Sequence, residues 1–155
     1  MDVINELINT PRECQIVSSR MVNAPLAFVY KAWTDPEYLS KWWGPTGFTN
    51  TFHEYDFRVG GKWKFTMHGP DNQGNFENES VFLQIESPDA IAFHHVSPPE
   101  FKIVATFESL SPNETEVTFR MVFDTPDQCE KIRSFAPEKN EENFDRLEEV
   151  LKNMA

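Results

Sequence analysis

Six successive segments between residues 48 and 124 alternate apolar and polar side chains, and this pattern constrains the fold more than any other feature. In 62–68, Trp63, Phe65 and Met67 share one face of an extended chain, while Lys62 and Lys64 share the other. Turns rich in Gly, Pro and Asn separate the segments, and 14–22 forms a further apolar stretch. Because strands joined by short turns pair antiparallel, the pattern predicts a seven-stranded antiparallel sheet.

One long amphipathic helix is predicted after the last strand. Pro126 opens a first helical stretch, and Pro137 begins the long helix, which continues to Met154. The apolar stripe of the long helix contains Phe144 and Leu147, and its other side is acidic. Since no other element is long enough to cover the apolar face of the sheet, we expect this helix to pack there.

Two short helices are predicted between the first and second strands. Pro25 suits the first position of the first helix, and Thr34 or Asp35 caps the second, which ends before Gly44-Pro45. These helices bring Trp33, Trp42 and Trp43 to one end of the sheet, where wide side chains close exposed apolar surface. Each tryptophan is either a plug in the core or the edge of a cavity that stacks on a ligand.

The composition indicates one domain of 155 residues, whose core we place at about 14–154. A net charge of −11 without a basic stripe argues against nucleic acid or anionic membranes as partners. The N-terminus has no signal-peptide pattern, no stretch approaches the ~20 apolar residues of a membrane span, and Cys14 and Cys129 are too few for a disulfide framework. We therefore expect a cytoplasmic protein without membrane insertion, whose first ten or so residues are loosely attached.

Five polar residues fall on the apolar phase of their elements: His53, Tyr55, Glu79, His95 and Asn140. Such groups pair with one another, with water or backbone, or with a ligand. In a meander, three strand steps of about 4.8 Å separate His53 from His95, which is too far for shared metal coordination. The chain also shows no nucleophile–base arrangement and no phosphate-binding loop. We expect no metal and no cofactor.

The blocks WTDPE, WWGP and GGKW, followed by NESVFLQI, IAFHHVS and ENFDRL, resemble the START-like superfamily. Within that superfamily, the chain is most similar to the bacterial group named for its likeness to the activator of the heat-shock protein 90 ATPase. The likeness extends from about Val17 to Leu151. It implies an α+β helix-grip fold, in which a curved antiparallel sheet wraps around the C-terminal helix and leaves a cavity between them.

The resemblance leaves three functions open, because this fold carries many activities. The first is binding of a small apolar or amphipathic molecule in the cavity. The second is a cyclase or dehydratase that uses His53, Glu79 or His95 as acid–base groups. The third is a co-chaperone that activates a chaperone ATPase, although the eukaryotic activator has a further domain for which this chain has no room. A monomer and a homodimer remain equally open.

The predicted cavity residues are those that face the sheet interior, lie on the helix stripe or close the end of the sheet. They are Trp33, Trp43, His53, Tyr55, Trp63, Phe65, Glu79, Val81, Phe93, His95, Phe107, Phe119, Asn140 and Phe144.

Overall fold

The computed structural model describes residues 2–154 and contains one sheet with helices on both of its faces. The helices are α1 (Val3–Ile8), α2 (Leu26–Thr34), α3 (Pro36–Trp42), α4 (Pro126–Arg133) and α5 (Ala136–Met154), with 3₁₀ turns η1 (Arg12–Cys14) and η2 (Pro70–Asn72). The strands are β1 (Gln15–Val22), β2 (Thr49–Tyr55), β3 (Lys62–His68), β4 (Asn75–Glu86), β5 (Ala90–His95), β6 (Phe101–Ser111) and β7 (Glu114–Val122).

The seven strands pair antiparallel in the order β1-β7-β6-β5-β4-β3-β2, which confirms the predicted sheet. Strands β2 to β7 form a continuous meander, and β1, the first strand in the chain, pairs with β7, the last. Helices α2 and α3 occupy the connection between β1 and β2, as predicted. The Asp35 carboxylate accepts a hydrogen bond from the Glu37 amide (3.0 Å), so Asp35 caps α3 just before Pro36.

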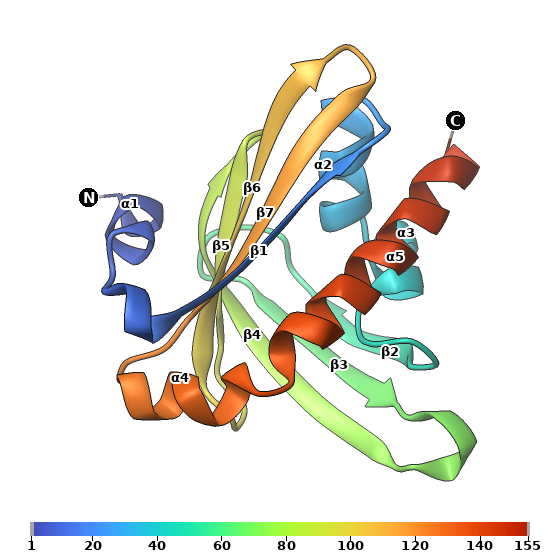
Figure 1. Ribbon diagram of the computed structural model, residues 1–155. Coiled ribbons are helices and arrows are strands. Elements are labelled where there is room, and N and C mark those ends of the chain that lie inside the picture. Colours follow the sequence, from blue (N-terminus) through green and yellow to red (C-terminus); the bar gives the residue numbers. More distant parts are fainter. Residues whose placement is uncertain (1, 155) are drawn as a thin grey trace.

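The inner face of the sheet is the face that α5 crosses, together with α2 and α3 (Figure 1). Its core is strongly aromatic and includes the fully buried Trp33, Trp42 and Trp63. On β1, Arg20 pairs with three carboxylates of α5, from Glu141 (2.7 Å), Asp145 (2.7 Å) and Glu148 (3.1 Å). These ion pairs attach the acidic side of α5 to β1, the edge strand of the sheet.

Helix α1 corrects the expectation that the first residues are loosely attached. It lies on the outer face of the sheet, on the side opposite α5 (Figure 1). Ile4 and Leu7 are buried there against a small cluster that includes Val104 and Val122, and the Ile4 amide donates to Gln84 Oε1 (2.9 Å). Six residues give too short an apolar pattern to predict a docked helix from sequence. Among residues 2–154, no helix is both long and apolar enough to cross a membrane.

Candidate functional site

A hollow of ≈ 180 Å³ lies on the inner face of the sheet, between strands β3 to β7, helix α5 and the turn that follows α3. Its apolar walls come from the strands and from Trp43. They are Trp43, Phe65, Met67, Phe101, Ile103, Phe119 and Met121. The volume is close to that of an engineered cavity of ~150 Å³ that holds benzene. The space therefore suits about one ring, because the surrounding aromatic side chains fill most of the interior.

Four polar side chains also line the hollow, and most of their atoms have protein partners. From α5, Asn140 donates from Nδ2 to Ser18 Oγ (3.3 Å), and Asn143 accepts from the Gly44 amide (2.8 Å). From the sheet, Asn78 and His95 lie 2.8 Å apart, from Oδ1 to Nε2. Polar groups on two opposite walls of an apolar space are suited to orienting a ligand.

His95 is the titratable side chain of this hollow. Its ring stacks on Phe101 with centroids 4.9 Å apart, and Nδ1 lies 3.0 Å from the Pro99 carbonyl oxygen. Burial lowers the pKa of His95 below its ordinary value of 6.5, since the charged form loses hydration there. The neutral imidazole is thus the form that the fold favours near neutral pH.

We expect this shift to appear in the pH dependence of stability. The unfolded chain binds the His95 proton more readily than the folded protein does, so the stabilisation is complete above 6.5 and declines as the pH falls toward the lower folded pKa. In urea titrations between about pH 5 and pH 7.5, His95→Gln should lose stability less steeply on acidification than the wild type. An NMR titration that gives His95 a pKa of 6.5 or more would contradict this.

The turn that follows α3 forms one wall of the hollow through Trp43, Gly44 and Pro45. Gly44 has φ +103°, a backbone conformation that favours glycine, and a Cβ there would lie 3.0 Å from Met67 Cε. Arg146 of α5 holds the turn in place. Its Nη1 donates to the Gly44 and Pro45 carbonyls (2.8 and 2.9 Å), and its Nη2 donates to the Lys41 and Phe48 carbonyls (3.0 and 2.8 Å).

The structure brings five of the predicted cavity residues together at the hollow: Trp43, Phe65, His95, Phe119 and Asn140. Six others are core residues packed beside it, in the aromatic cluster or against α5: Trp33, Tyr55, Trp63, Phe93, Phe107 and Phe144. Of the three tryptophans at the end of the sheet, Trp33 and Trp42 fill the core, because only 2% and 1% of their surface is exposed. Contact with a ligand stays a prediction for all of them.

His53, Glu79 and Val81 do not face the hollow, and their predicted placement was wrong. In β2, a bulge between Phe52 and Glu54 breaks the alternation, and His53 is exposed. In β4, Glu79 pairs with Lys64 and Val81 with Lys62, both on the outer face. His53 and Glu79 instead line a separate hollow of ≈ 250 Å³. Apolar alternation in β4 was assigned to the wrong face because Val81 and Leu83 are as apolar as Phe82.

Some residues of the hollow were not singled out from the sequence. Asn78 lies opposite Phe65 in the β3–β4 register, so an alignment of these two strands could have placed it inward. Asn143 follows Asn140 by three residues on α5 and thus shares its face. Ile103 and Met121 also line the hollow, but nothing in the sequence separates them from other apolar residues of their strands. Among residues 2–154, no three His, Cys, Asp or Glu side chains are grouped closely enough to hold a metal ion.

Comparison with known proteins identifies the family. The model of the family described as "Activator of Hsp90 ATPase homolog 1-like protein" matches residues 23–152. A crystal structure of a protein from Nitrosomonas europaea superposes with a TM-score of 0.84 at 22% identity, covering 94% of this chain and 98% of that chain. A solution structure from Arthrobacter aurescens gives 0.82 at 26% identity, covering 91% and 87%.

The solution structure of an AHSA1-like protein from Aeromonas hydrophila gives a TM-score of 0.70 at 19% identity, covering 90% of this chain and 93% of that chain. A comparison with curated proteins gave no match. The fold expected from the sequence resemblance is the fold that these structures share. With its seven-stranded sheet and long C-terminal helix, the chain belongs to the Activator of Hsp90 ATPase homolog 1-like family of START-like proteins.

Proposed function

We propose that this protein binds a small amphipathic molecule in the hollow between the sheet and α5. The observation that carries the proposal is a space of ≈ 180 Å³ with aromatic and methionine walls and polar groups on opposite sides. Its family is compatible with ligand binding at a general level. The volume favours a ligand of about one ring with a polar substituent.

The apolar walls would supply most of the binding free energy, at about 25 cal/mol per Å² of buried apolar surface. The polar groups would fix the orientation. Asn140 and Asn143 come from α5, and Asn78 and His95 come from the sheet, so a hydroxyl or carbonyl substituent meets a donor or an acceptor on either side. A ligand that lacks such a substituent leaves these groups without a new partner and should bind less tightly.

Titration with p-cresol and toluene tests this proposal. The two probes differ by one hydroxyl, and Trp43 on the cavity wall reports binding through its fluorescence. We expect saturable binding of p-cresol, about tenfold tighter than toluene, which corresponds to one net hydrogen bond. Ile103→Phe should fill the hollow and abolish binding, whereas Val59→Phe, at an exposed site outside it, should not. Equal binding to Ile103→Phe and the wild type would refute the proposal.

The family description favours a second candidate, a role as partner of a chaperone ATPase. Such a partner would contact the outer surface and would not need the hollow. Isothermal titration against a bacterial heat-shock protein 90 at micromolar concentrations separates the two functions. Heat that persists in Ile103→Phe would support the chaperone role, and an absence of heat would count against it.

The cyclase or dehydratase alternative has less support from the geometry. Of its three acid–base candidates, His53 and Glu79 line a different hollow, and His95 alone lines the cavity. Both ring nitrogens of His95 already lie within hydrogen-bond distance of protein oxygens. This arrangement favours binding and orientation over proton transfer to a ligand.

A further inference from the structure

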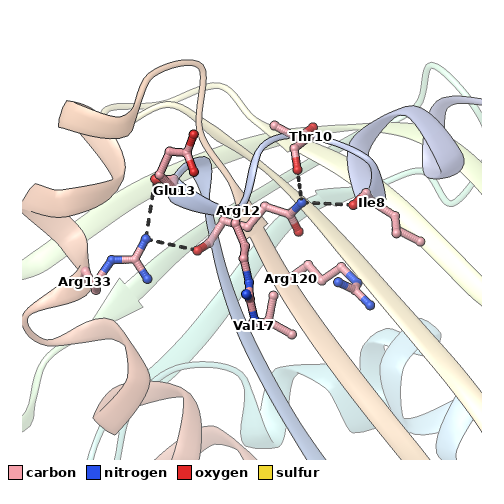
Figure 2. A pocket seen from close by; sticks show the side chains of 8 residues that line it. Ile8, Thr10, Arg12, Glu13, Val17, Arg120 and Arg133 are labelled. Carbon is pink, nitrogen blue, oxygen red and sulfur yellow. Dashed lines mark hydrogen bonds between the residues drawn. The ribbon is translucent and has the colours of Figure 1, made fainter.

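A further hollow, of ≈ 680 Å³, lies away from the cavity, where η1, the start of β1, β7 and α4 meet. Figure 2 shows Arg12, Arg120 and Arg133 around it. Arg120 lies opposite Val17 in the β1–β7 register, so both side chains are on the outer face of the sheet. The site is therefore independent of the inner-face cavity and of any ligand bound there.

The concentration of positive charge in this hollow is unusual for so acidic a chain. The sequence has six arginines and a net charge of −11, yet three of the six arginines line one hollow. Among residues 2–154, Arg12 and Arg120 form no ion pair with a carboxylate. Although the sequence has 25 acidic residues, these two guanidinium groups have no acidic partner in the part of the chain that the structure describes.

Two residues that line this hollow, Gln15 and Arg120, carry buried polar atoms without partners in the part of the chain that the structure describes. In the described part of the chain, Arg120 Nε and Gln15 Oε1 are buried and make no hydrogen bond. The Gln15 amide is not free to turn, because its Nε2 donates to the Thr10 and Ile8 carbonyls (2.7 and 3.0 Å). Oε1 is therefore fixed as an acceptor, and Arg120 Nε is a donor, both at a hollow that they line.

The guanidinium group of Arg133 already has protein partners. Its Nη2 donates to the backbone oxygens of Gln15 and Glu13 (3.2 and 3.5 Å), as the dashed lines in Figure 2 show, and its Nε pairs with Glu130. Glu13 also lines the hollow, but its carboxylate points away from the Arg12 and Arg120 guanidinium groups (Figure 2). The acidic side chain at the rim thus leaves these two guanidinium groups available.

We propose that this hollow binds a small organic anion through a carboxylate or phosphate group held by Arg12 and Arg120. Guanidinium groups recognise both anions in a planar, two-pronged geometry. A hydroxyl group of the same molecule would donate to Gln15 Oε1, which satisfies the buried acceptor. Its apolar part would lie against Ile8 and Val17, a valine that is 49% exposed.

The test is a titration of the full chain with two probes, inorganic phosphate and succinate, at an ionic strength kept constant with sodium chloride. NMR follows the backbone amide signals of residues 10 and 12–17 and the Nε–H signal of Arg120. We expect saturable shifts at these signals with at least one probe, and the probe that saturates identifies the group recognised. Shifts with neither probe, or shifts that grow linearly without saturation, would overturn the proposal.

Variants separate the site from a general effect of charge. Arg12→Gln and Arg120→Gln should each weaken binding at least tenfold. Arg58→Gln removes the same charge at an exposed side chain that pairs with Asp56, and it should leave binding unchanged. The Arg12 side chain is exposed and makes no hydrogen bond with the part of the chain that the structure describes, so its replacement should not disturb folding and keeps the test decisive if Arg120→Gln unfolds. Equal weakening in Arg58→Gln would refute a specific site.

Discussion

Replacement of Trp33 by alanine should reduce the free energy of unfolding by about 3–5 kcal/mol, the largest effect that we expect from one substitution. Trp33 is 2% exposed and lies at the centre of the aromatic cluster that closes the end of the sheet. Its ring centroid is 4.8 Å from that of Trp42, 5.6 Å from Phe107 and 5.9 Å from Phe119. Alanine would leave a void that rigid rings cannot collapse to fill. Urea denaturation measures the loss.

A pair of Trp→Phe variants separates packing from hydrogen bonding. The Nε1 of Trp42 donates to the Ala32 carbonyl (2.9 Å), whereas the buried Nε1 of Trp33 has no partner in the described structure. Phenylalanine at 33 thus removes an unpaired donor, and phenylalanine at 42 breaks a hydrogen bond and leaves an acceptor unpaired. We expect Trp42→Phe to cost about 1 kcal/mol more than Trp33→Phe. The reverse order would contradict this interpretation of the cluster.

Replacement of Arg146 by alanine should reduce the free energy of unfolding by about 3 kcal/mol, because it removes several hydrogen bonds made by a charged guanidinium group. The guanidinium contacts carbonyl oxygens along 41–48 and makes no ion pair with a carboxylate among residues 2–154. Burial lowers the pKa of Arg146, so the hydrogen bonds to the carbonyls offset a real loss of hydration. Without them, the side-chain hydrogen bonds that remain on the turn 43–48 are those from the Gly44 amide to Asn143, from the Thr46 amide to Glu142 and from Asn50 Nδ2 to the Trp43 carbonyl.

The expected consequence reaches the candidate ligand site. Because Trp43, Gly44 and Pro45 form one wall of the hollow, Arg146→Ala should also weaken p-cresol binding. Arg146→Lys should behave almost like alanine, since an ammonium group cannot reach carbonyls on both sides of the turn as the guanidinium fork does. Arg58→Ala, at an exposed pair, should change stability by less than about 0.5 kcal/mol. If urea denaturation gives Arg146→Lys the same free energy of unfolding as the wild type, the guanidinium group is not what holds the turn.

Local patterns in the sequence were enough to predict most of the fold. The alternation in 62–68 and the stripe of Phe144 and Leu147 define which faces meet, and both are present in the structure. The Asp35 cap and Pro36 fixed the start of α3. These features depend on residues that are close in sequence, where periodicity and capping act directly.

Features that depend on pairing between distant segments could not be predicted. A bulge moves His53 out of the alternation of β2, and an apolar outer face beneath α1 makes Leu83 resemble a residue of the inner core. Similarly, the hollow of ≈ 680 Å³ is lined by Arg12, Arg120 and Arg133, which are far apart along the chain. The volume left by the aromatic side chains depends on their packing, and no sequence pattern specifies it.

The most direct test of ligand binding is a set of intermolecular nuclear Overhauser effects between p-cresol and the methyl groups of the protein. Bound in the hollow, the ring should give cross-peaks to the Ile103 and Met121 methyl groups, both of which line it. Cross-peaks only to exposed methyl groups such as those of Val59 or Leu110, or no cross-peaks at saturating p-cresol, would contradict a ligand site between the sheet and α5.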